Sequence, residues 1–301
     1  MDYGLLIRSQ YKAGDDMVAA FDDCMAQARL AEKLGFASLL KGSHYAGAPL
    51  QELQQIPFLS RVMAECPSLR LITGIVLLSL HKPLDIAELL ATIDVMSNGK
   101  LTFGAGLGYR EVEFQGFGTT QKDRVARFEE NLEAVVKLWT EDNVTLKGSH
   151  FNLDNVTLSC KPVQKPHPPI WIGGHSRPAL RRVARFADGW HPVGANPAVP
   201  LQPKQFAESC EELRRLAELE GRRYEDLTIC FKAPLYDKDA ITVSGTDRRS
   251  FSGSTSQIVD DIGTYGELGM HELIVDFRSD TLNETLERMA QFREEICSQV
   301  P

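Results

Sequence analysis

The sequence predicts an alternating α/β protein of the (β/α)8 TIM-barrel class, with one insertion after the fourth helix and another after the seventh strand. Short apolar runs alternate with amphipathic helix patterns along the 301 residues. The runs are apolar throughout, which is typical of parallel strands covered by helices. A doubly wound open sheet is the alternative, but it needs a glycine fingerprint near the N-terminus, and Gly35 and Gly42 do not make one.

Eight runs are predicted to be strands because each is short, apolar and bounded by turn residues. In chain order they cover residues 3–9, 36–40, 69–78, 101–107, 169–172, 188–191, 227–232 and 271–277.

Eight helices are predicted to follow these strands, because apolar residues recur there at helical spacing. Asp15 and Asp16 supply N-cap chemistry for the first helix, and Pro83 lies in the first turn of the third. The predicted helices cover residues 17–34, 56–65, 83–96, 122–139, 178–186, 205–219, 258–268 and 282–297.

The alternation pauses at two places. Residues 142–168 contain short runs of β-forming residues between turn residues, which predicts an insertion with a hairpin. Residues 236–256 are polar and rich in serine and glycine, which predicts a long and mobile loop. We therefore expect a single domain over residues 1–301, with the loops at 45–53 and 236–256 as candidate lids.

The composition excludes several function classes. The net charge of −8 and the lack of a Lys/Arg block argue against nucleic-acid or anionic-membrane binding, and no apolar run approaches the length of a membrane span. No signal peptide is evident. The six cysteines have no CxxC spacing and predict free thiols in a cytoplasmic protein, while the seven histidines show no HxxxH metal motif.

Reactive groups in such a barrel lie just beyond the C-terminal ends of the strands. These positions offer glycines, backbone amides and histidine, and no catalytic triad or carboxylate pair can be argued from them. That composition favours a cofactor that carries the chemistry itself. The positions are Ser9 and Gln10, Ser43 and His44, Gly74 and Ile75, Gly106 to Arg110, Gly173 to Ser176, Trp190 and His191, Lys232, and Asp276 to Arg278.

The best candidate for a phosphate site is the turn Gly173-Gly174-His175-Ser176, because it opens a helix. Free amides and the positive end of the helix dipole favour an anion there, and His175 is expected to contribute its backbone N–H. The alternative is an ordinary serine-capped helix. Arg124 or Arg127 would supply a balancing cation unless they are solvated surface groups.

His44 lies beyond the second predicted strand, where imidazole suits a proton donor or hydrogen-bond partner of a reacting ring. The alternative is a loop histidine that binds a backbone carbonyl. Gly74 and Ile75 interrupt a strand of leucine and β-branched residues, which indicates a bulge or an unusual peptide against a ligand.

Four stretches together resemble the bacterial luciferase-like, flavin- or deazaflavin-dependent monooxygenases and oxidoreductases. They are AEKLGFASLLKGSHY (31–45), TGIVLLSLHKPLDIAELLATIDVMSNGKLTFGAGLGYREVEFQGFG (73–118), KPVQKPHPPIWIGGHSRPALRRVARFADGWHPVG (161–194) and ELGMHELIVDF (267–277).

The resemblance implies a barrel that holds reduced flavin at the C-terminal ends of its strands. It places the bulge that backs the flavin ring, often a non-proline cis peptide, at Gly74 and Ile75, and it makes His44 the catalytic residue. The other cofactor-binding residues that it implies are Gly106, Gly108, Arg127, Gly173, Gly174, His175 and Ser176.

The resemblance further implies an oxidoreductase in which reduced FMN reacts with oxygen to give a peroxyflavin that oxygenates a small organic substrate. The lack of a GxGxxG motif assigns flavin reduction to a separate reductase. A homodimer is expected from the family alone. Deazaflavin-dependent members commonly have Asp-His where this chain has Ser43-His44, which favours FMN. The alternatives are hydride transfer with coenzyme F420, and a flavin-binding protein without turnover.

Overall fold

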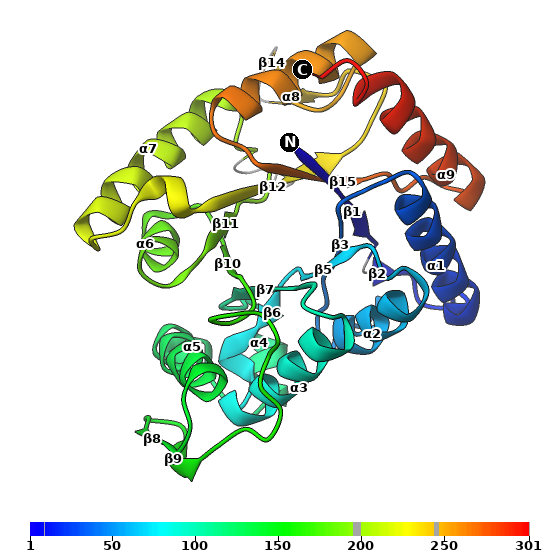
Figure 1. Cartoon of the computed structure of the whole chain (residues 1–301). Coiled ribbons are helices and arrows are strands. Elements are labelled where there is room, and N and C mark those ends of the chain that lie inside the picture. The colour runs from blue at the N-terminus through cyan, green and yellow to red at the C-terminus, as the bar shows by residue number, and fades with distance from the viewer. Residues whose placement is uncertain (9, 195–199, 244–246, 301) are drawn as a thin grey trace. The chain divides into compact units, whose positions relative to one another are not determined.

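The computed structural model describes residues 1–8, 10–194, 200–243 and 247–300. Ser9, at the end of the first predicted strand, and residues 244–246, in the predicted loop 236–256, lie outside the described residues. Helices alternate with parallel strands in the sheet order β10-β11-β12-β15-β1-β3-β5-β7-β6, and β10 also pairs with β7. This is the order of a (β/α)8 barrel, so the predicted fold class is confirmed (Figure 1).

The barrel strands follow the predicted order. They are β1 (Asp2–Ile7), β3 (Ser38–Lys41), β5 (Arg70–Thr73), β6 (Val76–Leu77), β7 (Leu101–Gly106), β10 (Ile170–Gly173), β11 (Gly189–His191), β12 (Thr228–Leu235) and β15 (Glu272–Asp276). Three short antiparallel pairs accompany them: β2 (Gln10–Tyr11) with β4 (Gln51–Glu52), β8 (Val144–Lys147) with β9 (Asn152–Val156), and β13 (Thr242–Val243) with β14 (Asp247–Arg248).

The predicted helices are all present within a few residues of their expected ends. They are α1 (Met17–Lys33), α2 (Gln55–Glu65), α3 (Pro83–Met96), α5 (Arg124–Thr140), α6 (Arg177–Phe186), α7 (Pro203–Leu219), α8 (Thr255–Glu267) and α9 (Leu282–Gln291), which continues as a π-helical turn at Phe292–Ile296. A short helix that was not predicted, α4 (Glu111–Gly116), follows β7.

The chain divides into two compact units. Unit 1 comprises residues 1–8, 16–40 and 171–301, and unit 2 comprises residues 9–15 and 41–170. The organisation as one domain therefore stays a prediction. In unit 1, aromatic rings of α7, α8 and β12 form the core, where Phe231 packs against Phe206 and Tyr265 with ring centroids 5.4 and 4.9 Å apart.

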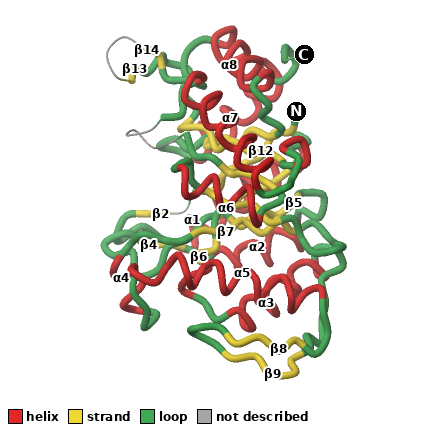
Figure 2. The backbone as a smooth tube through the Cα atoms, turned by 90° about the vertical axis from the view of Figure 1, so that its left-hand side faces the viewer, coloured by secondary structure: helices red, strands yellow, loops and turns green. Residues whose placement is uncertain are grey.

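Unit 2 is built from strands β5, β6 and β7 with α2, α3 and α5. Trp139 of α5 packs edge-on against Phe103 of β7 and donates from its indole Nε1 to the carbonyl of Ala87 in α3. The insertion predicted over residues 142–168 contains the β8–β9 hairpin, which lies beside α5 (Figure 2). Asp94 of α3 is fully buried and accepts from the amides of Val163 and Gln164, which fixes the chain after the hairpin.

The third strand is interrupted where the sequence indicated an unusual peptide. The run 69–78 forms β5 up to Thr73, has a cis peptide between Gly74 and Ile75, and resumes as β6, so the predicted irregularity at Gly74 and Ile75 is confirmed. Hydrogen bonds hold this break: the Gly74 amide donates to the Lys41 carbonyl over 2.9 Å, and Gln55 Nε2 donates to the Ile75 carbonyl over 3.2 Å.

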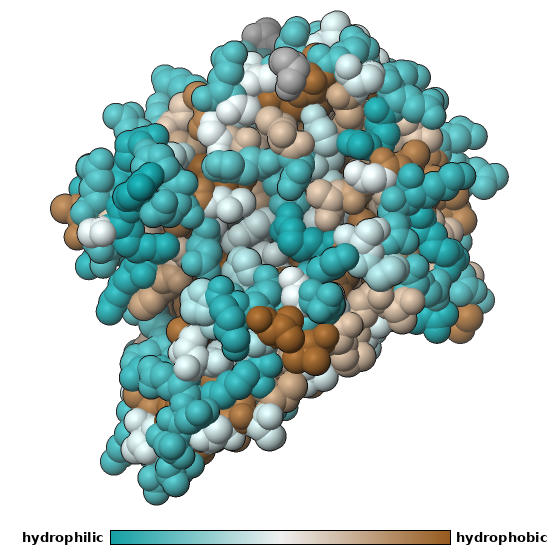
Figure 3. All heavy atoms as spheres, viewed as in Figure 1, coloured by the Kyte–Doolittle hydropathy of each residue, from teal (hydrophilic) through white to brown (hydrophobic). Residues whose placement is uncertain are grey.

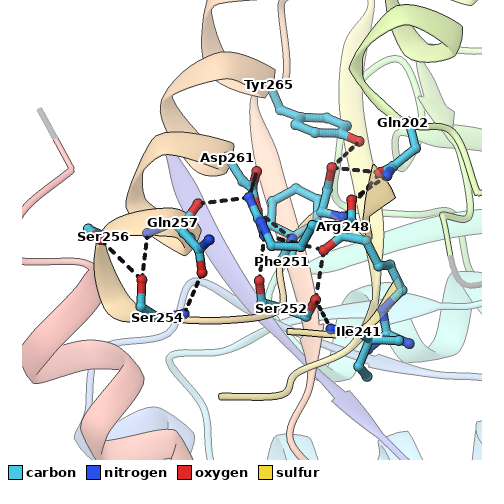
Figure 4. Close-up of polar contacts among 12 residues, drawn as sticks. Gln202, Ile241, Arg248, Phe251, Ser252, Ser254, Ser256, Gln257, Asp261 and Tyr265 are labelled. Carbon is cyan, nitrogen blue, oxygen red and sulfur yellow. Dashed lines mark hydrogen bonds and ion pairs between the residues drawn. The ribbon is translucent and has the colours of Figure 1, made fainter. Parts of the chain in front are cut away.

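The described part of the loop predicted over residues 236–256 contains regular structure, and its mobility stays a prediction. It contains the β13–β14 pair, and Arg248 forms two hydrogen bonds of 2.7 and 2.8 Å with Asp261 of α8 (Figure 4). The same carboxylate accepts from the Phe251 amide, and Gln202 accepts from the Ser250 hydroxyl. These contacts tie residues 248–252 to α8 and to the start of α7.

The surface is mostly hydrophilic on the face shown in Figure 3, and apolar side chains appear there in small groups. Among the described helices, none combines the length and apolar composition needed to cross a bilayer. The six cysteines all lie among the described residues and form no disulfide bond.

The close packing of β5 against β7 leads to a stability prediction. A Cβ on Gly104 would overlap the backbone carbonyl of Thr73, whereas a Cβ on Gly106 would meet only the flexible end of the Ile75 side chain. We expect Gly104→Ala to lower the free energy of unfolding by about 3 kcal/mol and Gly106→Ala by about 1 kcal/mol.

Denaturant unfolding of the purified variants measures this difference. Gly116→Ala is the matched control, because nothing lies within 4 Å of its Cβ position. A Gly106→Ala variant less stable than Gly104→Ala would contradict the packing argument.

Candidate functional site

His44 is held by a buried carboxylate in unit 2. It follows β3 through Gly42 and Ser43, and its Nδ1 lies 2.9 Å from Oε1 of Glu113 in α4. The same oxygen accepts from the Tyr45 amide over 2.9 Å, and the Glu113 side chain is fully buried. Gln54 fixes the loop further by donating to the His44 carbonyl. The ring of His44 therefore contacts the Glu113 carboxylate, which differs from the alternative of a loop histidine that binds a backbone carbonyl.

This contact determines the role of each ring nitrogen. A carboxylate oxygen only accepts, so Nδ1 of His44 carries the proton that it shares with Glu113. Nε2 is then the acceptor of the neutral ring, and it lies 3.5 Å from the Tyr109 hydroxyl. The ring can take a proton at Nε2 and return it, while the buried carboxylate balances the positive charge.

Among the described residues, the buried acceptor atoms near His44 that have no hydrogen-bond partner include Oε2 of Glu113 and Oε1 of Gln55, on residues that are 1% and 4% exposed. The Gln55 amide nitrogen donates to the Ser43 hydroxyl and to the Ile75 carbonyl, over 3.1 and 3.2 Å. Buried acceptors without donors are costly, so these atoms favour a bound group that carries N–H or O–H donors.

The glycines after β7 have different structural roles. Gly106 is one of the cofactor-binding residues that the resemblance implies, and the Ile75 side chain occupies the position that a Cβ on Gly106 would take. Gly106 thus makes room for the side chain of Ile75, and Gly106 can affect a cofactor site only by positioning Ile75. Gly108 has a φ of +76°, a conformation that a side chain would strain, and a Cβ there would lie 3.4 Å from Phe114.

Arg127 is not a solvated surface group. It is 8% exposed, and its Nε donates to the Ser79 carbonyl over 2.9 Å. Burial lowers the pKa of its guanidinium, while the nearby Asp123 and Glu130 raise it. Arg124, the other candidate, donates to Gln121 in its own first turn. Of the two, Arg127 is the buried cation.

The turn at residues 173–176 lies in unit 1 and opens α6. Gly174 has a φ of +102°, and a Cβ there would lie 2.9 Å from Cβ of Ala179. Its carbonyl accepts from the Trp190 indole over 2.7 Å, which fixes the turn. Burial lowers the pKa of His175.

The start of α6 keeps its amide donors available. Ser176 is the N-cap residue, yet its side chain makes no capping hydrogen bond, so the alternative of an ordinary serine-capped helix is not what the structure shows. Within the described residues, no acceptor faces the amides of Gly174, His175 and Ser176. Such amides at a helix N-terminus suit a phosphate group.

The predicted site residues thus form two groups that the structure describes separately. His44, Gly74, Ile75, Gly106, Gly108 and Arg127 lie in unit 2, and residues 173–176 lie in unit 1. Sequence reasoning did not single out Glu113 or Gln55, since no local pattern marks a partner of His44 that is 69 residues away. Among the described residues, no group of three His, Cys, Asp or Glu side chains is arranged to hold a metal ion.

Comparison with known proteins gives several relatives. The chain is 31% identical over 175 residues to an FMNH2-dependent dimethylsulfone monooxygenase of Pseudomonas putida, an alignment that covers 56% of this chain and 47% of that protein. It is 29% identical over 144 residues to a phthiodiolone/phenolphthiodiolone dimycocerosates ketoreductase of Mycobacterium tuberculosis, covering 47% of this chain and 36% of the relative. The chain spans about half the length, or less, of the curated relatives that it matches.

Solved structures share the fold. The monooxygenase RslO1 from Streptomyces bottropensis superposes with a TM-score of 0.84 at 24% identity, over the whole of both chains. An F420-dependent secondary alcohol dehydrogenase superposes with a TM-score of 0.78 at 17% identity, over 99% of this chain and 98% of that one. At these identities the likeness concerns the fold alone.

The model of the luciferase-like monooxygenase family matches residues 1–241 of the 301. This match covers well over half of the chain. The protein therefore belongs to the luciferase-like monooxygenase family, a group of enzymes that includes FMN-dependent and F420-dependent members.

Proposed function

We propose that the protein is a monooxygenase that binds reduced FMN and oxygenates a small organic substrate. The observation that carries this proposal is the N-terminus of α6, where the turn at residues 173–176 presents amide donors that no described residue accepts from. An FMNH2-dependent monooxygenase among the relatives supports the choice of cofactor.

The residues present fit the phosphate of such a cofactor. An anion gains hydrogen bonds from the amides of Gly174, His175 and Ser176 and a favourable interaction with the helix dipole. Gly174 has a positive φ of +102°, which lets the backbone turn its amides toward the phosphate. Arg127 is proposed as a further phosphate ligand, since only its Nε is engaged by a described residue and its other N–H donors can bind an anion.

The residues near His44 fit the ring. A reduced isoalloxazine carries N–H donors, and the unpartnered oxygens of Glu113 and Gln55 are buried acceptors. The peptide at Gly74 and Ile75, which packs against Gly106, is proposed to lie against one face of the flavin ring. Gly108 is proposed to lie at the edge of the ring.

When bound, reduced FMN supplies the electrons that activate oxygen. The chain contributes a positioned proton acceptor, Nε2 of His44, and a buried carboxylate that keeps Nδ1 protonated. Tyr109 supplies a hydroxyl within 3.5 Å of Nε2. A separate flavin reductase, molecular oxygen and a second copy of the chain stay predictions as partners.

Hydride transfer with coenzyme F420 is the second candidate function. The fold neighbour that uses F420 supports it, and the α6 amides fit the phosphate of either cofactor. FMN is favoured by Ser43, which stands where F420-dependent members commonly have aspartate. Ser43 is buried and its hydroxyl accepts from Gln55, so the position carries no charge.

Anaerobic titration of the protein with reduced FMN and with reduced coenzyme F420 tests the cofactor. We expect tighter binding of FMN, followed by oxygen-dependent reoxidation when air is admitted. Preference for F420 without oxygen consumption would make hydride transfer the function. Binding of FMN with no oxygen-dependent turnover on any substrate would indicate a flavin-binding protein without catalysis.

Proline at position 176 tests the phosphate turn. Ser176 has a φ of −69°, which proline adopts, so Ser176→Pro removes one amide donor at little cost in conformation. Loss of a hydrogen bond to an anion is expected to weaken FMN binding about tenfold or more. Ser176→Ala keeps the amide and is expected to bind as the parent does. Equal affinities of the two variants would count against the turn as a phosphate site.

The His44–Glu113 pair predicts a defect in turnover. Glu113→Leu removes the oxygen that accepts from Nδ1 and from the Tyr45 amide, so the ring is no longer held with its proton on Nδ1, and we expect turnover to fall about 10²-fold, as in His44→Asn. Glu111→Gln, on the exposed side of the same short helix, is the control. Oxygen consumption by FMN-loaded protein measures the effect, and unchanged turnover in Glu113→Leu would refute the role of the carboxylate in holding the ring.

A further inference from the structure

Three neighbouring strands of unit 1 each present an aromatic side chain to the helices. Trp190 of β11 stacks on Phe206 of α7, with ring centroids 5.7 Å apart, and Phe231 of β12 packs against the same ring. Phe277, just after β15, packs against Phe292 at the end of α9. Because successive side chains of a strand alternate between faces, the residues beside these three point away from the helices. They are His191, Lys232 and Asp276; Arg278 lies beyond the end of β15, and its side chain contacts Asp276.

Lys232 is a desolvated cation on this second face. It is partly buried, and no described residue lies within hydrogen-bond or ion-pair distance of its Nζ. Burial lowers the pKa of its amine, Asp276 raises it, and Arg278 lowers it. A buried ammonium without a direct counter-ion is costly, so this position favours an incoming negative charge.

The nearby carboxylate is already used by another cation. Arg278 Nε lies 3.2 Å from Oδ2 of Asp276, and the Arg278 amide donates to Oδ1 over 3.1 Å. The carboxylate that influences Lys232 is therefore already paired with Arg278. Asp276 is 6% exposed, whereas Arg278 is 48% exposed and can reach an incoming group.

His191 adds no charge to this face. Its ring is fully buried, its Nδ1 lies 2.9 Å from the Cys230 carbonyl, and burial together with the nearby Lys232 lowers its pKa to about 4. The imidazole is therefore neutral near pH 7, with Nδ1 as the donor. With Lys232 protonated, the face formed by His191, Lys232, Asp276 and Arg278 carries one net positive charge.

This face lies at the same edge of the sheet as the α6 turn. Strands β10, β11, β12 and β15 are consecutive and parallel, and Gly173 is in register with His191. Two strand spacings separate β10 from β12, which is about 10 Å. A ligand at Lys232 would thus lie beside a group bound at residues 173–176, without using the same donors.

We propose that Lys232 and Arg278 form a binding site for the acidic group of an organic anion, such as a carboxylate, sulfonate or phosphate. Assigning that anion as the substrate rests on the proposed function; the anion site itself does not. The same chemistry would suit an acidic group on the tail of the cofactor, so the experiment must separate these two sources.

Calorimetric titration with benzoate, a simple aromatic carboxylate, tests the site on the full chain without cofactor. Saturable binding is expected for the parent, with affinity reduced about tenfold or more in Lys232→Met and in Arg278→Met. Lys232→Arg keeps the charge and is expected to retain binding. Lys238→Met, a charge removal at an exposed position of unit 1, is the control and should bind as the parent does.

The variants are compared by thermal unfolding, so that a folding defect is not mistaken for lost binding. Absence of benzoate binding in the parent, or affinity unchanged in Lys232→Met, would overturn the proposal. Equal losses in Lys238→Met and Lys232→Met would also overturn it, because the effect would then be one of overall charge.

A second titration with benzoate, on protein saturated with reduced FMN, distinguishes a substrate anion from an acidic group of the cofactor. Retained benzoate binding, still dependent on Lys232, supports a substrate site. Loss of benzoate binding in the presence of FMN overturns the substrate assignment and indicates that the site binds the cofactor. If FMN does not bind but benzoate binding depends on Lys232, the proposed function fails and the anion site stands.

Discussion

The alternation of side chains between the two faces of each strand determines which residues pack in the core and which can face a ligand. In unit 1 a strand residue either packs against the helices, as Phe231 does against Phe206 and Tyr265, or faces the opposite way, as Lys232 does. The helix side demands large apolar groups, because they supply the stability of the core. The other side tolerates polar groups near the strand ends. Alternation therefore fixes where chemistry can occur before any ligand is considered.

A buried charge imposes the second constraint, in unit 2. Glu113 has no exposure to solvent, so its carboxylate must be balanced by donors, and the structure supplies the Tyr45 amide and the imidazole of His44. This requirement orients the loop after β3 and ties it to α4. No described residue donates to Oε2 of the same carboxylate, so this buried oxygen still lacks a hydrogen-bond donor. The arrangement is stable enough to fold and still favours a ligand that donates hydrogen bonds.

The sequence predicted the alternation of elements well, because it depends on local periodicity and end signals. The helix at residues 83–96 was placed with its ends as found, helped by Pro83 and by the turn at Asn98 and Gly99. What failed depends on contacts distant in sequence. Gly74 and Ile75 did mark the break in the third strand, whereas α4 is too short to show a helical period. The contact of Glu113 with His44 could not be read from spacing, and neither could the filling of the space over Gly106 by Ile75.

The two proposed anion sites differ in what recognises the charge, and that difference suits a family with many substrates. The turn at residues 173–176 would bind through backbone amides, which survive most substitutions as long as the turn and α6 form. Lys232 and Arg278 would bind through side chains, which a single substitution removes. Fold neighbours at 17% and 24% identity keep the barrel with TM-scores of 0.78 and 0.84. A site made of backbone amides depends only on the fold that such divergence preserves, whereas a site made of side chains is lost with a single substitution.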